Sequence, residues 1–439
     1  MGTYRHKWVK RTGVAGATPV KGIARRLRAA GIPTVSNVTP EEEALALLDV
    51  ASEIEHGLMV EYLYAAYASS NNTIRSTLSN IAKQEMGHLI TVQNLILMLG
   101  GKPYLGRQDQ TPNESEDPFP FELQPPSLPS LAMYSSCEAP PADLVPAAQA
   151  ALYAEVTQLA AMTVPFVNRV GALYAKLYWM FMDDDQTVDV WTGFPVDEFQ
   201  LQAGRHVREP ASPQEKLQSD IDEWPGSVDD LQVTPCLSRK DARAAIFAIA
   251  AQGEGGPHGI SSHFDRFLAV YELAKATPLF AHDVPTSPTL VTSQPGTIDH
   301  QRAVPLVKVG DSFYRLVILQ MLLGLTYERT ESIRSELLDA SRTDMTTALR
   351  RIAAHLSGKV PRRAGQADTN TAKAAAVFAR PSVVRGDRST LRGAFGVEIG
   401  LLEAALNELK QAPNDPVAAA MVAVFEAFAA EKRNLHQRI

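Results

Sequence analysis

The chain is poor in cysteine, carries no strong net charge and has no long hydrophobic run, and each absence excludes a class of protein. Its 439 residues include only Cys137 and Cys236, too few for a disulfide framework or a cysteine-bound zinc site, so a reducing, cytoplasmic location is expected. No apolar stretch reaches the roughly 18 residues of a membrane-spanning helix. The net charge of −7 argues against general binding to nucleic acids or anionic membranes. No phosphate-binding glycine loop, nucleophile elbow or dinucleotide fingerprint supports a hydrolase or a nucleotide-dependent enzyme.

The sequence does contain apolar residues at helical spacing, and these follow an N-terminal segment rich in basic residues. Residues 1–31 carry eight Lys or Arg and no acid. They lack the apolar run of a secretory signal, so we expect residues 1–38 to form a basic arm that is disordered or wraps the protein. Residues 39–280 are expected to form an all-α four-helix bundle with long crossover loops, and residues 281–439 a further helical region packed on it.

Start and stop signals predict where the helices lie. A threonine cap, a proline in the first turn and three acids open the first helix at residues 39–43, and Gly100–Gly101 ends the second. The proline-rich stretch 106–141 is expected to be an ordered connection without a regular element, as in the crossover loop of a bundle. Further helices are expected at 142–182 with a break at Pro165, from 238 with an interruption at 253–257, and at 303–330, 331–357, 370–379 and 390–432.

Three ionisable residues stand inside apolar helical stripes. Glu55 lies at the centre of the stripe of the first helix. Glu85 and His88, three residues apart, share a face of the second helix with Leu89 and Val92. A buried carboxylate and a buried imidazole are costly unless both are partnered, and a metal ion accepts both. We therefore predict a metal site; pairing with an arginine or a tyrosine is the alternative for a single buried glutamate.

The remaining ligands are less plain from the sequence. A dinuclear carboxylate site on four helices takes a Glu from two helices and Glu-x-x-His from the other two. The fourth helix offers Glu254 with either His258 or His263, and we prefer His263 because Gly-Gly-Pro interrupts the helix before His258. The third helix contributes no inward acid, since Glu155 lies upstream of Pro165 without a geometric reason to reach the centre. A fourth carboxylate is therefore missing.

The motifs that carry these residues resemble a known family. Four phrases occur in the order and spacing of the ferritin-like domain of iminophenyl-pyruvate dimer synthases, which act in violacein- and rebeccamycin-type biosynthesis: EIEHGLMVEYLYAAYA, IAKQEMGHLITVQNLILMLGGKP, DPFPFELQPPSLPSL and AAQGEGGPHGISSHFDRFLAVY. The resemblance spans about residues 41–380. It implies a ferritin-like bundle with inward metal ligands at Glu55, Glu85, His88, Glu254 and His263. Ala172 and Ala251 stand where relatives commonly have Glu, which permits a dinuclear, an asymmetric or a mononuclear site.

We accordingly expect a metal-dependent oxidative enzyme that uses iron and O2 on an amino-acid-derived or aromatic small molecule. Carboxylate and imidazole ligands suit Fe(II). Glu85 is the expected bridging and catalytic ligand, and Tyr62 the expected hydrogen-bond partner of a ligand. The alternatives are a non-redox coupling of imines or enamines and a non-catalytic metal-binding scaffold. Neither a nucleic acid nor a membrane is an expected partner, and a homo-oligomer is compatible with the sequence.

Overall fold

The computed structural model describes residues 7–9, 32–34, 38–107, 117–183, 206–225, 228–254, 262–367, 369, 371–412 and 416–439. Its architecture is all-α, as the sequence predicts. Two short strands, β1 (Lys7–Val9) and β2 (Ile32–Thr34), pair antiparallel; the rest of the expected basic arm, as far as residue 37, lies outside the described residues. In the described ranges, none of the helices combines the length and the hydropathy needed to cross a membrane.

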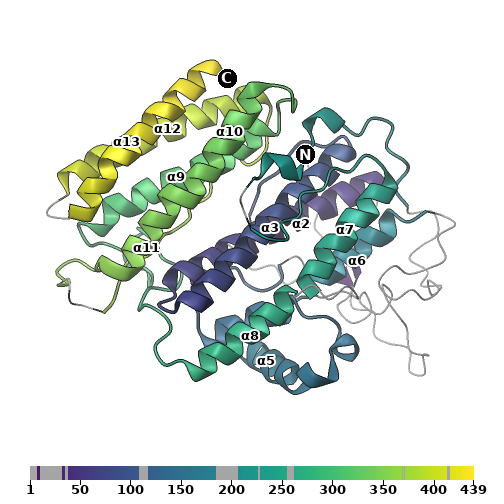
Figure 1. Cartoon of the computed structure of the whole chain (residues 1–439), viewed down its shortest axis with the longest axis horizontal. Helices are drawn as coiled ribbons and strands as arrows, with labels where there is room; N and C mark the ends of the chain where they lie inside the picture. Colours follow the sequence, from purple (N-terminus) through teal and green to yellow (C-terminus); the bar gives the residue numbers. More distant parts are fainter. Residues whose placement is uncertain are drawn as a thin grey trace.

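The centre of the molecule is an antiparallel pair of long helices, α2 (Pro40–Ala68) and α3 (Asn72–Met98) (Figure 1). Reciprocal hydrogen bonds between Thr39 and Glu42 fix the start of α2. Asn71 caps α3 by accepting from two backbone N–H groups, and the short link between the helices makes them antiparallel neighbours. Most of both helices is buried, which places their polar residues inside the molecule.

The helices that follow in the sequence pack around this pair. α6 (Val170–Met180) contacts α2 and α7 (Arg239–Glu254), and α7 contacts α3. α4 (Leu128–Cys137) packs against α5 (Ala150–Thr163) and α8 (His263–Ala276), and α8 also contacts α3. Figure 1 shows α5 and α8 side by side below the central pair. Short 3-10 turns complete this part: η1 (Ala142–Leu144), η2 (Ala147–Gln149), η3 (Glu215–Leu217) and η4 (Ile221–Glu223).

The C-terminal helices form a separate layer beside the central pair (Figure 1). The buried helix α9 (Ala303–Gly324) contacts α10 (Ser332–Thr343), α11 (Arg350–Lys359) and α12 (Arg388–Gln411), and α13 (Pro416–Arg438) packs on α12. A π-helical turn, η5 (Asp344–Leu349), joins α10 to α11. α11 packs against α2, so this layer is attached to the helices that carry the candidate ligands.

Four of the predicted element assignments differ from the structure. The helix predicted at 331–357 contains a π-helical turn, the helix predicted at 390–432 is two helices, and two further segments differ in type. The stretch 106–141 contains a regular element, α4, whose start is marked by reciprocal hydrogen bonds between Ser127 and Ser130. Residues 371–379 form no helix. There, Lys373 N–H donates to the Asp283 carbonyl at 2.7 Å and Ala374 N–H donates to the Val360 carbonyl at 2.8 Å, so hydrogen bonds to distant segments override the helix propensity of the alanines.

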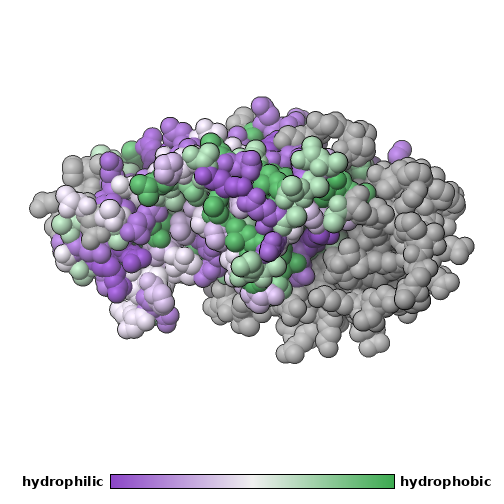
Figure 2. All heavy atoms as spheres, turned by 90° about the horizontal axis from the view of Figure 1, so that it is seen from below, coloured by the Kyte–Doolittle hydropathy of each residue, from purple (hydrophilic) through white to green (hydrophobic). Residues whose placement is uncertain are grey.

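Hydrophobic and hydrophilic residues are interspersed on the described surface seen from below (Figure 2). The exposed large apolar side chains include Met162 on α5 and Leu279 after α8, at 77% and 93% exposure. Isolated apolar side chains of this kind are normal on a protein surface. These exposed side chains therefore do not by themselves indicate a binding surface.

Candidate metal centre

A cluster of carboxylates and imidazoles lies buried among α2, α3, α4 and α8. Its members are at most 4% exposed: Glu55, Glu85, His88, Glu138 and His263. They form two groups, and within each group the candidate ligand atoms lie within 4.8 Å of one another. Glu55, Glu85 and His88 form one group, and Glu85, Glu138 and His263 form the other. Glu85 belongs to both.

Glu85 lies between the two imidazoles and directs one oxygen toward each. Its Oε2 is 2.9 Å from His88 Nδ1, and its Oε1 is 2.9 Å from His263 Nδ1. Glu55 Oε2 approaches His88 Nδ1 at 3.5 Å. The two imidazole rings have their centroids 5.5 Å apart. This is the arrangement expected of a carboxylate shared by two neighbouring ion sites.

The carboxylates of the cluster perturb each other because they are buried together. Burial and the neighbouring Glu85 raise the pKa of Glu55 to about 7. Burial, with Glu85 and Glu55, also raises the pKa of Glu138 well above its usual range. Burial acts to raise the pKa of Glu85 as well, but His263 and His88 outweigh it and hold that pKa below the ordinary value. A bound cation would relieve the repulsion among these carboxylates.

The imidazoles respond in opposite directions to the same environment. Burial acts to lower the pKa of His88, but Glu55 and Glu85 outweigh it and raise the pKa to about 10. For His263 burial prevails over the attraction of Glu85, and the pKa is lowered. The pKa values of the two histidines are therefore shifted in opposite directions although both histidines contact Glu85.

Three polar atoms of the cluster form no hydrogen bond: Glu55 Oε2, Glu85 Oε1 and His263 Nδ1. The last two lie 2.9 Å apart but are not aligned for a hydrogen bond. Unpaired buried polar atoms are rare in proteins because each loses its interaction with water without a replacement. A metal ion would partner all three, so these residues fit a metal bound through oxygen and nitrogen.

Two glutamines set the orientation of the imidazoles. His88 Nε2–H donates to Gln252 Oε1 at 2.9 Å, and His263 Nε2–H to Gln84 Oε1 at 3.2 Å. The amide nitrogens of both glutamines are already committed, since they donate to the backbone carbonyls of Asp230 at 2.9 Å and of Asp229 at 3.1 Å. Each amide oxygen therefore faces its histidine, and Nδ1 of each ring is left toward Glu85.

The loop that holds these glutamines packs directly on α3. A Cβ atom added to Gly87 would come within 2.6 Å of the Gln232 carbonyl oxygen, so only glycine permits this approach. Thr91 donates to the same carbonyl at 3.3 Å, and Asn94 donates to the Thr234 carbonyl at 2.9 Å. The glycine between Glu85 and His88 thus has a structural purpose: it lets the loop reach the histidine supports.

Two tyrosines donate to the outer oxygens of the cluster. Tyr174 OH on α6 donates to Glu55 Oε1, and Tyr62 OH on α2 donates to Glu138 Oε1 at 2.9 Å. Gly253 lies close to Glu138, since a Cβ on Gly253 would lie 2.9 Å from Glu138 Oε2. The cluster borders a cavity of about 10 Å³, lined in addition by Val170, Gly171 and Ile249. Such a space holds about one water-sized atom.

The structure brings together four of the predicted ligands: Glu55, Glu85, His88 and His263. Glu254 is the last residue of α7, and its side chain lies outside the described residues, as does the whole of His258. Ala172 is buried on α6 but does not line the cavity. Glu155 is bound to Lys275 at 2.9 Å, away from the centre, as expected.

Sequence reasoning missed Glu138, which joins Glu55 and Glu85 as a third carboxylate of the described cluster. Glu138 is the C-cap residue of α4, inside the stretch that was expected to be irregular. The signal that could have revealed α4 is local: Ser127 and Ser130 form a capping box, and Pro129 lies in the first turn. Gln84 and Gln252 were also missed, because glutamine on a helix carries no pattern that indicates a histidine support.

Comparison with known protein families supports the helical fold of this part of the chain. The model of the ferritin-like family matches residues 48–272, just over half of the chain, from α2 to α8. Neither a search of curated proteins nor a search of solved structures found a match. The matched span contains all five members of the buried cluster. The chain therefore belongs to the ferritin-like family.

Proposed function

We propose that the chain is a metal-dependent oxidative enzyme with a dinuclear centre, and that its metal is iron. The observation that carries the proposal is the position of Glu85 in both buried groups. Glu55 and His88 would hold one ion, Glu138 and His263 would hold the other, and Glu85 would contribute to both. Carboxylate and imidazole ligands suit Fe(II), and iron bound in this way supplies electron transfer between a substrate and O2.

The surrounding residues orient the ligands. Gln252 and Gln84 keep Nδ1 of each histidine toward the centre, while Tyr174 and Tyr62 occupy the outer oxygens of Glu55 and Glu138. Glu55 Oε2 and Glu85 Oε1 form no hydrogen bond and are available to a metal ion. The small cavity limits the access of water to the centre.

We further propose an amino-acid-derived or aromatic small molecule as substrate, with O2 as cosubstrate, as in relatives of the iminophenyl-pyruvate dimer synthases. The support is the resemblance of the phrases that contain Glu55, Glu85, His88 and His263. A drug-sized ligand needs a pocket of about 300 Å³ or more, so in this proposal the cavity of about 10 Å³ opens when substrate binds.

Metal content per chain tests the dinuclear centre. We expect about two irons in the wild-type protein purified anaerobically after expression with added iron, about one in Glu138→Ala and none in Glu85→Ala, because only Glu85 serves both groups. Glu61→Gln is the matched control: Glu61 is buried on α2 outside the cluster, and it accepts a hydrogen bond from Glu122 N–H at 3.0 Å, which glutamine can retain. Equal iron in Glu85→Ala and in the wild type would rule out the proposed centre.

The small size of the cavity favours a second candidate, a metal-binding scaffold without turnover. Oxygen consumption separates the two. Protein loaded with two irons and supplied with an aromatic α-imino acid formed in situ should consume O2 if it is an oxidative enzyme. Coupling of the imine without O2 consumption would identify a non-redox coupling enzyme. If the protein neither couples the imine nor consumes O2, the scaffold is the remaining candidate.

A further inference from the structure

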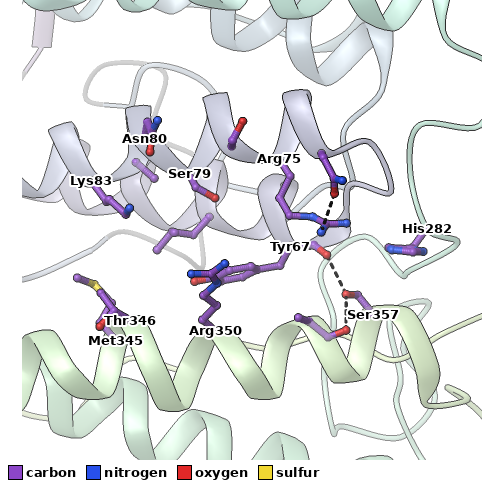
Figure 3. A pocket seen from close by; sticks show the side chains of 15 residues that line it. Tyr67, Arg75, Ser79, Asn80, Lys83, His282, Met345, Thr346, Arg350 and Ser357 are labelled. Carbon is purple, nitrogen blue, oxygen red and sulfur yellow. Dashed lines mark hydrogen bonds between the residues drawn. The ribbon is translucent and has the colours of Figure 1, made fainter. Parts of the chain in front are cut away.

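A second concave site lies on the other side of α3 from the metal centre. It is a pocket of about 480 Å³ between α3 and the segment formed by η5 and α11, a volume typical of small-molecule sites. Figure 3 shows Ser79, Asn80 and Lys83 of α3 on one wall and Thr346 and Arg350 on the opposite wall. None of the five members of the metal cluster lines it.

The charged residues that line this pocket are all cationic. Arg75, Lys83 and Arg350 contribute, His282 lies at one end, and no acidic residue is among the lining residues. Neither Lys83 nor Arg350 forms an ion pair within the described part of the chain. Burial, together with the cations Arg75, Lys359 and Lys373, lowers the pKa of His282. The pocket is thus a positively charged concavity without a counter-ion from the described chain.

Uncharged donors and an apolar floor complete the pocket. The side chains of Ser79 and Asn80 form no hydrogen bond in the described residues, so their donors are free for a ligand. Tyr67 lies between the two walls, next to Arg350 (Figure 3). Leu63, Tyr67 and Met345 also line a smaller, almost wholly apolar cavity next to this pocket. A ligand here therefore meets both cations and apolar side chains.

We propose that this pocket binds a small organic anion, one that carries a carboxylate or a phosphate on an apolar body. Lys83 and Arg350 hold the anionic group, with hydrogen bonds from Ser79 and Asn80. The apolar body lies over Tyr67 toward the neighbouring apolar cavity. Because α3 separates this ligand from the metal centre, the site is a binding site distinct from the centre, and its existence does not depend on the proposed oxidative function.

Isothermal titration calorimetry of the full chain tests the proposal, with phenyl phosphate and 3-phenylpropionate as probes. We expect binding of at least one probe, with affinity that falls as the salt concentration rises. Lys83→Gln and Arg350→Gln should each weaken binding about tenfold, the loss typical of one hydrogen-bonded charge. Arg351→Gln is the matched control, because Arg351 is exposed on the same helix and does not line the pocket; its affinity should be unchanged.

Further measurements distinguish binding in this pocket from binding at other sites. Binding of the probes to this pocket should persist in Glu85→Ala. A phosphate that was held instead by metal at the centre would no longer bind in that variant. Benzyl alcohol should bind at least tenfold more weakly than phenyl phosphate, and so should inorganic phosphate. Equal affinity for benzyl alcohol would overturn the role of the cations, and equal affinity for inorganic phosphate would overturn the role of the apolar floor. Absence of binding by both organic probes at millimolar concentration would overturn the proposal.

Discussion

Removing the hydrogen bond from His88 to Gln252 tests whether this contact holds the His88 imidazole in place. We expect Gln252→Leu to weaken metal binding about 10- to 100-fold, as is typical when the support of a metal-bound histidine is lost. Gln252→Glu keeps an acceptor for Nε2–H and should restore most of the affinity. Competition with a chelator of known affinity measures the dissociation constant in each variant.

Gln93→Leu is the control for this experiment. Gln93 is fully buried on α3, where it donates to Ser52 and accepts from the Tyr104 N–H, but it does not touch the cluster. The Gln93→Leu substitution should lower the stability of the protein without changing its affinity for metal. If Gln252→Leu binds metal as tightly as Gln93→Leu does, Gln252 is only a packing residue.

A site residue was predictable where the sequence pattern that reveals it lies within its own helix. Glu55, Glu85 and His88 lie within long helices, where periodicity alone indicates the inward face. Glu138 ends a ten-residue helix, and its partners come from α2, α3 and α8. Nothing within a few residues of Glu138 reveals that those helices converge on it, so its role becomes visible only in three dimensions.

At the scale of elements, the approach of the 229–232 loop to α3 depends on Gly87. Gly87→Ala places a methyl group 2.6 Å from the Gln232 carbonyl, so the loop must move. We expect a loss of about 1–3 kcal/mol in unfolding free energy, the usual cost of overpacking. In the proposed dinuclear centre, the weaker support of both histidines should lower the content of both irons. Urea unfolding and elemental analysis measure the two effects.

Gly400→Ala serves as the comparison for Gly87→Ala. Gly400 is an exposed glycine in α12, and a Cβ there would meet no atom within 4 Å. Alanine should therefore stabilise this helix by about 0.5–1 kcal/mol and leave the iron content unchanged. A Gly87→Ala protein that is as stable and as rich in iron as Gly400→Ala would contradict the close approach of the loop.

The elements themselves were predictable where their signals are strong and local. The cap at Thr39 and the glycines after α3 correspond to real boundaries. The conformation of the segment 371–379 was not predictable, because its alanines favour a helix. Hydrogen bonds to Asp283 and Val360 hold the segment extended instead. Residues 331–357 were expected as a single helix, but they form α10 and α11 joined by a π-helical turn. Such local underwinding of a helix has no clear sequence signal.

At the scale of the whole molecule, a buried ion pair attaches the last helix to the C-terminal layer. Lys432 Nζ of α13 lies 2.8 Å from Asp344 Oδ1 of η5, and both side chains are 1% exposed. Burial raises the pKa of Asp344 to about 6, although Lys432 opposes this. The folded protein therefore holds this proton more tightly than the unfolded chain does. The stability contributed by Asp344 falls by about 3 kcal/mol as the pH rises from about 4 to about 6.

Removal of the cation should widen this pH window. In Lys432→Met the pKa of Asp344 rises further, so we expect the decline to continue above pH 6 and the variant to lose more stability at pH 8 than at pH 5. Thermal unfolding at the two pH values measures the difference. Lys308→Met removes the cation of an exposed pair with Glu408 and should respond equally at both. An equal response of Lys432→Met at the two pH values would contradict the burial of Asp344 as an ionisable group.

The loop at residues 229–232 has a consequence for how the centre fills. The carbonyls of Asp229 and Asp230 are consecutive, yet they hold glutamines from two helices, and each glutamine supports a histidine of a different group. A displacement of this loop therefore disturbs both halves in the same direction. Changes to the loop should yield a mixture of fully loaded and empty molecules, whereas the loss of a single ligand such as Glu138 leaves molecules that are half filled.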